Sequence, residues 1–168
     1  MKNIIVIGLS LFTLVACSFK QQYTQSSKEI DSYKMLIQNY NTKNWKNFSE
    51  HYHDTAKVFF NSIKPLMVKD IPSFHEGNET QFSSRLVLEE GQEYEMVLTN
   101  QGKTWVNFWG MWEGTLEVTG RKLKIPIHLT AQFVNGKIVE EHGYWDNAPV
   151  VLALQEIEVA TKIHNYSE

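Results

Sequence analysis

Four side chains that can exchange protons alternate near the end of the sequence: Glu140, His142, Tyr144 and Asp146. Their spacing of two residues places them on one face if the segment is a β-strand. A histidine beside carboxylates in a partly dry cavity can be tuned to act near neutral pH. This chemistry suits proton abstraction next to a carbonyl, or an aldol-type step. Asp146 and His142 are therefore the candidate catalytic residues, with Glu140 and Tyr144 as ligand contacts.

A predicted β-hairpin decides which way these residues point. Residues 122–134 alternate between apolar and mostly polar side chains, and residues 137–147 return after the turn Asn135-Gly136. Asn-Gly is the strongest short-range signal for a two-residue hairpin loop. Directly opposed residues in such a hairpin point to the same side of the sheet.

This hairpin register gives the four polar residues a buried face. It places His142 opposite Leu129 and Tyr144 opposite Ile127, on the apolar side of the sheet. Buried polar groups need partners or a cavity, so this conflict predicts a site. The apolar residues expected on the same face are the remaining candidate ligand contacts, namely Phe108, Trp112, Ile127 and Leu129.

Two alternatives to this placement stay open. A three-residue loop would reverse the parity and turn Glu141 and Trp145 inward. Alternatively, Tyr144 and His142 fill the interior as packing residues, while Glu140 and Asp146 lie at its rims in solvent or bonded to backbone.

Two further strands are predicted before the hairpin. Residues 93–99 alternate, and residues 104–118 form a long strand that a turn at Thr119-Gly120 joins to the next one. This arrangement puts an aromatic and apolar group on the opposite face of the sheet, consisting of Trp105, Trp109, Met111 and Trp145. Such a patch would not stay in water, so it predicts a sheet-to-sheet homodimer or a cover formed by the C-terminal helix.

Helical patterns flank the strands. Ser27 is a candidate N-cap for a helix that ends at Asn41-Thr42, and a second short helix holds Trp45 and Phe48. Residues 64–85 are expected to be loop plus one helix, in which His75 and Glu76 could overhang the site or simply lie in a loop. Residues 148–164 have helical composition. Helices followed by a meander of long strands predict an α+β domain with a strongly curved antiparallel or mixed sheet.

The first residues have the pattern of a secretory signal. A short basic start, Met1-Lys2-Asn3, precedes an apolar run over residues 4–15 that is shorter than the roughly 20 residues of a membrane-spanning helix. Leu14-Val15-Ala16-Cys17 resembles a bacterial lipoprotein lipobox, which implies cleavage before Cys17 and lipid on its sulfur. The alternative is a cleaved signal that leaves a free Cys17.

These features predict three segments: a signal peptide over residues 1–16, a lipidated Cys17 with a flexible tether over residues 17–27, and one domain over residues 28–168. The expected location is the cell envelope, anchored to a bacterial membrane. Ser18 after the cysteine, rather than Asp, favours the outer membrane by the same resemblance.

Composition excludes several partners. The formal net charge is −3 and the sequence has no basic cluster, so no nucleic-acid partner is predicted. It contains no glycine loop for phosphates, no dinucleotide fingerprint and no nucleophile motif, so no cofactor is predicted. His51, His53 and Asp54 have the spacing of metal ligands on a strand, but a solvated loop at a helix end explains them better and no metal is predicted.

The domain resembles a known superfamily. The pattern Gly-Met-Trp-Glu-Gly at residues 110–114 and the segment Asn-Gly-Lys-Ile-Val-Glu-Glu-His-Gly-Tyr-Trp-Asp-Asn at residues 135–147 follow two N-terminal helices. Together they resemble the nuclear transport factor 2-like superfamily, specifically its SnoaL-like branch, over residues 28–154. The resemblance implies a cone-shaped sheet wrapped around helices, with a pocket inside.

The resemblance also bears on chemistry. Members include polyketide cyclases, steroid isomerases, dehydratases, epoxide hydrolases and non-catalytic pocket or scaffold domains, so the fold does not choose the activity. Asp146 matches the acid/base aspartate of SnoaL-like cyclases. The epoxide hydrolase branch needs an arginine between two acids, and neither Arg85 nor Arg121 lies beside a candidate acid in the sequence.

Two functions are therefore expected. The first is a lipid-anchored pocket protein that binds a small apolar or aromatic molecule, with acid/base turnover at Asp146 and His142 as an extension of that binding. The second is a non-catalytic interaction or scaffold module that dimerises at the membrane surface.

Overall fold

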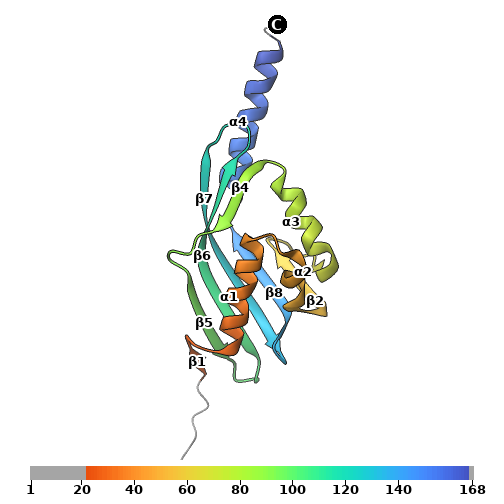
Figure 1. Ribbon diagram of the computed structural model, residues 1–168, viewed down its shortest axis with the longest axis vertical. Coiled ribbons are helices and arrows are strands. Elements are labelled where there is room, and N and C mark those ends of the chain that lie inside the picture. The colour runs from red at the N-terminus through yellow and green to blue at the C-terminus, as the bar shows by residue number, and fades with distance from the viewer. Residues whose placement is uncertain (1–21, 167–168) are drawn as a thin grey trace, which may run out of the picture.

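The computed structural model describes residues 22–166, and this part of the chain forms a curved eight-stranded sheet with four α-helices (Figure 1). The predicted α+β class and the curved mixed sheet are confirmed. The strands are β1 (Tyr23–Thr24), β2 (Tyr52–Phe60), β3 (Leu66–Met67), β4 (Phe82–Val87), β5 (Glu93–Leu98), β6 (Thr104–Leu116), β7 (Lys122–Val134) and β8 (Lys137–Trp145). The helices are α1 (Lys28–Asn41), α2 (Trp45–Glu50), α3 (Ile71–Glu79) and α4 (Ala148–Asn165), with a 3₁₀ turn over Val68–Asp70.

The sheet has the strand order β1-β5-β6-β7-β8-β2-β3. The first part of β6 pairs with β5 and its last part pairs with β4, so two short strands share one edge of a long one. The β2–β8 pair is parallel, whereas β5, β6, β7 and β8 form an antiparallel meander. The long strands β6 and β7 therefore form the centre of the sheet.

The main core lies between α1 and the concave face of the sheet (Figure 1). Ser27 caps α1 by accepting a hydrogen bond from the Ile30 backbone N–H, as predicted. The buried face of the helix repeats at helical spacing, and each large apolar side chain that it buries contributes about 1.5–3 kcal/mol. This face consists of Ile30, Tyr33, Leu36 and Ile37.

The turn between β6 and β7 is longer than predicted. Thr115 pairs with Lys122 rather than with Lys124, because the chain turns over residues 117–121 and not only at Thr119-Gly120. A shift of two residues preserves the parity of a strand. The predicted faces of β6 are thus confirmed: Phe108, Trp112 and Leu116 lie inside, and Trp105, Trp109 and Met111 lie outside.

A β-bulge overturns the predicted faces of β8. The two-residue turn at Asn135-Gly136 is confirmed, and Phe133 pairs with Ile138. The next pair is Gln132 with Glu140, so Val139 is an extra residue on β8. One inserted residue moves every later side chain of the strand to the other face.

The segment over residues 64–85 contains the predicted helix, α3, and also the strands β3 and β4, which were not predicted. Val87 of β4 exchanges two hydrogen bonds with the Asn41 side chain, which ties this strand to the end of α1. The C-terminal helix α4 projects from the body (Figure 1). Its residue Ala153 packs against Leu116 and Leu123, so α4 does not cover the outer tryptophans.

Candidate functional site

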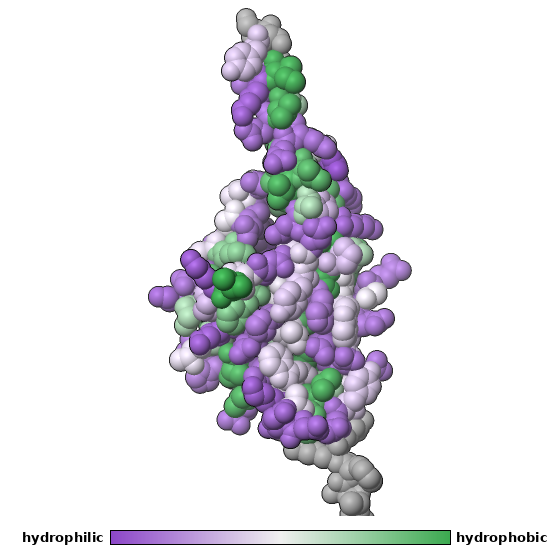
Figure 2. Space-filling model, turned by 180° about the vertical axis from the view of Figure 1, so that it is seen from behind, coloured by the Kyte–Doolittle hydropathy of each residue, from purple (hydrophilic) through white to green (hydrophobic). Residues whose placement is uncertain are grey.

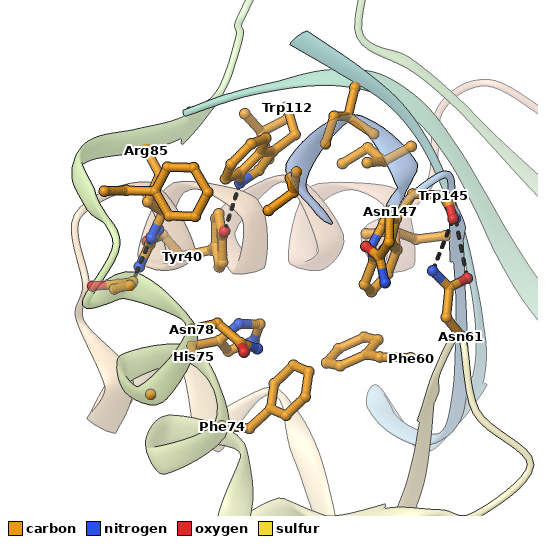
Figure 3. Close-up of a pocket in the computed structure, with 18 of the residues that line it drawn as sticks. Tyr40, Phe60, Asn61, Phe74, His75, Asn78, Arg85, Trp112, Trp145 and Asn147 are labelled. Atoms are coloured by element: carbon orange, nitrogen blue, oxygen red, sulfur yellow. Dashed lines mark hydrogen bonds and ion pairs between the residues drawn. The ribbon is translucent and has the colours of Figure 1, made fainter. Parts of the chain in front are cut away.

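A cavity of about 510 Å³ opens into the concave side of the sheet. This is the size of a typical small-molecule site. Its wall combines aromatic and aliphatic side chains with a few polar groups from all the surrounding elements (Figure 3). The aromatic lining residues are Tyr40, Phe48, Tyr52, Phe60, Phe74, His75, Phe82, Trp112 and Trp145.

Glu141 supplies a buried carboxyl group to this cavity. The bulge at Val139 turns it inward, and its exposure is 1%. The Tyr52 hydroxyl donates a 2.5 Å hydrogen bond to Oε2, and the Tyr33 hydroxyl donates one to Oε1. Both carboxyl oxygens are therefore held in place by phenols that come from α1 and β2.

Burial changes the acidity of the Glu141 carboxyl group. Desolvation raises the pKa of Glu141 from its ordinary value of 4.5, although the hydrogen bonds from Tyr33 and Tyr52 lower it in part. The phenols respond in the same way, because burial and the nearby Glu141 raise the pKa of Tyr33 and of Tyr52 well above 10. Because the two phenols hold their protons more tightly, Glu141 is the group of this trio suited to exchange protons.

Arg85 brings the second buried charge to the cavity, and it is already paired. Its Nε donates a 2.5 Å hydrogen bond to Oε1 of Glu79, and its Nη1 donates a 2.6 Å bond to the Tyr40 carbonyl. The guanidinium also lies 3.8 Å from the centre of the Tyr40 ring. Lys43 contacts the other oxygen of Glu79 at 2.7 Å. Arg85 therefore does lie beside an acid in space, namely Glu79, although the two residues are six positions apart in the sequence.

Hydrogen bonds orient two tryptophans on opposite sides of the cavity (Figure 3). Trp112 Nε1 donates to the Tyr40 hydroxyl at 2.9 Å. Trp145 Nε1 donates to Oδ1 of Asn147 at 2.6 Å, and Asn61 bonds both the N–H and the carbonyl of the Trp145 backbone. These indole rings are positioned by polar contacts as well as by packing.

The predicted inward placement of three residues on β8 is wrong. Glu140, His142 and Tyr144 lie on the outer face, where Tyr144 is 53% exposed and His142 Nε2 lies 2.8 Å from Glu140 Oε1. The predicted register did not include the bulge at Val139. These side chains consequently do not reach the cavity, and the acid/base role expected of His142 and the ligand contacts expected of Glu140 and Tyr144 lose their geometric basis.

Asp146 also lies away from the cavity. It is exposed just beyond β8, and its Oδ1 accepts a 2.8 Å hydrogen bond from the Ala148 backbone N–H at the start of α4. A carboxylate at this place satisfies one of the unpaired N–H groups of a helix start. Asp146 therefore takes the backbone-bonded position that the sequence left open as an alternative.

The predicted apolar contacts divide into two groups. Trp112, Ile127 and Leu129 line the cavity, as expected of its apolar face. Phe108 is fully buried beneath Tyr33 and Tyr94 and does not line it.

Sequence reasoning missed the acid that the cavity contains. Glu141 and Trp145 were expected inside only under the alternative of a three-residue loop, and both line the cavity. A bulge on β8 gives the same parity as a longer loop would. The sequence signal for a buried acid is Glu140-Glu141, two consecutive acids of which one had to face inward whichever parity held. The buried Tyr33 and Tyr52 were not assigned to the site, because their sequence positions are distant from β8.

The outer face of the sheet carries a row of upright aromatic rings. His128 stacks on Trp109 at 4.8 Å and on Tyr144 at 6.4 Å, and His142 stacks on Tyr144 at 6.2 Å and on Phe59 at 4.7 Å. The planes of neighbouring rings in this row are nearly parallel, with angles of 6–24° between them. Figure 2 looks onto this side of the molecule, where residues of intermediate hydropathy lie among hydrophilic ones.

Metal ligands do not gather in the described part of the chain. His51 contacts Ser32 and Asn39, and His53 contacts Thr55. Within residues 22–166, no three His, Cys, Asp or Glu side chains come together as they would around a metal ion. His51 ends α2, whereas His53 and Asp54 lie in β2 and not in the predicted loop.

Comparison with known proteins identifies the fold. No protein-family model and no curated protein matches the sequence. Among solved structures, the chain is similar to IdmH, a proposed polyketide cyclase from Streptomyces antibioticus, with 15% identity, a TM-score of 0.63 and coverage of 77% of this chain and 99% of that one.

Two other solved structures agree. A proposed SnoaL-like polyketide cyclase from Jannaschia sp. CCS1 has 13% identity and a TM-score of 0.61, covering 76% of this chain and 91% of that one. A protein of unknown function from Burkholderia pseudomallei, described as nuclear transport factor 2-like, has 11% identity and a TM-score of 0.61, covering 75% and 96%. The chain has the nuclear transport factor 2-like fold of the SnoaL-like proteins.

Proposed function

We propose that the domain binds a small, uncharged apolar or aromatic molecule in its cavity and that Glu141 exchanges a proton with this ligand. The observation that carries the proposal is one buried carboxyl group, held by two phenols, in a cavity of about 510 Å³ with aromatic walls. The similarity to structures described as proposed polyketide cyclases supports a pocket of this kind.

The charges of the cavity favour an uncharged ligand. Arg85 is already bound to the Glu79 carboxylate and to the Tyr40 carbonyl, so an anionic ligand would have to compete with Glu79 for it and would also meet the Glu141 carboxyl group. A cation would lose its hydration among the apolar walls, and burial, which raises the pKa of Glu141, disfavours the charged form of this carboxyl that would attract it. Aromatic walls instead match the flat surface of an aromatic or polycyclic molecule.

Glu141 has two chemical uses in such a site. As a carboxylate, it takes a proton from a carbon next to a carbonyl, and the electron pair of that C–H bond moves to the carbonyl oxygen. As a neutral acid, it returns the proton to another atom of the same ligand. Isomerisations, cyclisations and dehydrations use this exchange, and an environment that raises a carboxyl pKa brings both forms within reach near neutral pH.

Binding is tested with N-phenyl-1-naphthylamine, an uncharged probe whose fluorescence increases in apolar surroundings. We expect saturable binding by the wild type. Leu129→Trp fills the cavity from β7 and should abolish binding, whereas Thr130→Trp adds the same side chain on the outer face and should leave it unchanged. Competition by naphthalene on the wild type checks the result without any variant. A wild type that binds neither molecule contradicts the proposal.

The location of the protein is part of the proposal. Leu14-Val15-Ala16-Cys17 supports a lipid anchor that holds the domain at a bacterial membrane, with the outer membrane favoured by Ser18. Residues 1–21 lie outside the described part of the chain. Within that part, no helix is both long and apolar enough to cross a membrane. Mass spectrometry of the protein from its own cells should find diacylglycerol on Cys17, and Cys17→Ala should release the protein from the membrane fraction.

A second candidate function is a dimeric interaction module. The row of upright rings on the outer face favours this function. Trp109, at one end of the row, is 40% exposed, and a partner would remove this apolar surface from water. Two copies that pack these faces together would cover Trp105, Trp109 and Met111, while both cavities stay open on the opposite side of each sheet. Dimerisation is therefore compatible with ligand binding.

A further inference from the structure

His75 is the polar group of the cavity that neither the core nor the paired charges explain. It lies on α3, which begins at the fully buried Ile71 and carries Pro72 in its first turn. In Figure 3 it projects from this helix toward the space between Tyr40, Phe60 and Phe74. The sequence left this residue as part of a loop, or as part of a segment overhanging the site.

Aromatic rings hold the imidazole in one orientation. It stacks on Trp45 with ring centres 5.3 Å apart and an angle of 8° between the planes. Four further rings contact its edges and faces at 5.1–5.8 Å, namely Tyr40, Phe48, Phe60 and Phe74. A ring packed in this way cannot turn its nitrogen atoms toward water without breaking several contacts.

The Nε2 atom of this ring is buried and has no hydrogen-bond partner among the described residues. Nearly all buried polar atoms in folded proteins are paired, so an unpaired one in a residue that lines a cavity indicates a missing partner. Burial lowers the pKa of His75 to about 4, and the nearby Arg85 adds to this effect. The ring is consequently neutral at physiological pH, with one nitrogen that donates and one that accepts.

We propose, on the basis of the proposed small-molecule function, that His75 Nε2 forms a hydrogen bond with a hydroxyl or carbonyl group of the bound ligand. The cavity then has two polar recognition points, His75 on α3 and Glu141 on β8, between aromatic walls. Its ligand is an uncharged aromatic molecule that carries at least one such oxygen. His75 selects this ligand over an unsubstituted hydrocarbon of the same shape.

Naphthalene and 2-naphthol test this selectivity, because they differ by one hydroxyl group. Their affinities are measured by displacement of N-phenyl-1-naphthylamine from the wild type, His75→Phe and the control His53→Phe, which makes the same change at an exposed position on β2. His75→Phe keeps an aromatic ring beside Trp45 but removes the nitrogen. We expect it to bind naphthalene within about twofold of the wild type and 2-naphthol at least about fivefold more weakly, the worth of one hydrogen bond.

The outcomes separate this inference from the proposed function. Equal changes in the affinity of both molecules, or none in either, would overturn the role of His75 while leaving the cavity as a binding site. A wild type that binds neither molecule would overturn both. Nitrogen-15 spectra of histidine-labelled wild type provide a test without a variant: 2-naphthol should shift the His75 Nε2 signal and naphthalene should not. A Nε2 signal that neither molecule shifts contradicts the inference.

Discussion

Two buried titratable residues in one cavity, Glu141 and His75, respond to burial in opposite directions. Desolvation disfavours the charged form of each, so it raises the pKa of the carboxyl group and lowers that of the imidazole. Both side chains are therefore biased toward their neutral forms. Burial thus works against a charge on either residue, which favours an uncharged ligand.

Glu141 makes the folded protein less stable as the pH rises. Its folded pKa is raised, so above pH 4.5 the folded state retains a proton that the unfolded state has lost, and stability declines up to the folded pKa. We expect Glu141→Gln to flatten this decline at pH values above 4.5. Thermal melting across this range measures it. Glu140→Gln, one residue away on the outer face, should keep the slope of the wild type; identical slopes for both variants would contradict the prediction.

His75 makes the folded protein less stable at acidic pH. Its folded pKa of about 4 lies below the ordinary 6.5, so the unfolded state binds a proton first and stability is lost as the pH falls from 6.5 toward 4. The loss should approach about 3 kcal/mol at most, since one pKa unit is worth about 1.4 kcal/mol. Urea unfolding of His75→Phe should show a smaller loss in this range than His53→Phe. An equal loss in both variants would show that His75 does not titrate in this way.

Among the strands and helices, the main difference between the predicted and the observed structure is one extra residue, Val139, on β8. The strand β7, the Asn135-Gly136 turn and the helix starting after Ser27 all follow from local signals, namely alternation, turn chemistry and capping. The bulge at Val139 has no such signal. It arises where β8 must pair with β7 and, in parallel, with β2, so its origin lies in the whole sheet. The inner and outer residues of β8 were exchanged for this reason.

The inner face of β8 also depends on a residue without a side chain. A Cβ atom at Gly143 would lie 2.6 Å from the Trp145 ring, 2.9 Å from Phe60 and 3.0 Å from Leu129, three residues that line the cavity. We expect Gly143→Ala to destabilise the protein by about 1–3 kcal/mol and to weaken binding of N-phenyl-1-naphthylamine.

Gly77→Ala is the matched control for this substitution. Gly77 lies in α3 with nothing within 4 Å of an added Cβ atom, so alanine should stabilise the helix by up to about 1 kcal/mol. Chemical denaturation measures both changes. A destabilisation of the same size in both variants would mean that glycine at position 143 does not keep the wall of the cavity open.

At the scale of the molecule, the curved sheet separates two surfaces with different chemistry. The concave side encloses α1 and the cavity, whereas the convex side presents the stacked rings of Trp109, His128, Tyr144 and His142. The faces of β6 were predictable from its alternation alone. The stacking of the β8 residues Tyr144 and His142 on the outer face was not predictable, because the bulge at Val139 turns these side chains outward.

The convex side predicts the oligomeric state. If two copies pack these faces together, Trp109→Glu places a buried charge in the interface and should convert a dimer into a monomer. Sedimentation velocity of the protein lacking residues 1–17 measures the change. Val118→Glu is the control, since Val118 is 73% exposed in the turn between β6 and β7. A wild type that sediments as a monomer would contradict the dimer and would leave the ligand site unaffected.

Proton abstraction from 5-nitrobenzisoxazole shows whether Glu141 works as an acid/base group inside the apolar cavity. A base that removes the C3 proton of this uncharged aromatic molecule breaks its N–O bond and releases a coloured phenolate. We predict that the wild-type rate rises with pH above 4.5 as Glu141 ionises, that Glu141→Gln loses at least about 100-fold and that Glu140→Gln keeps the wild-type rate. Equal rates for the wild type and Glu141→Gln would contradict the account.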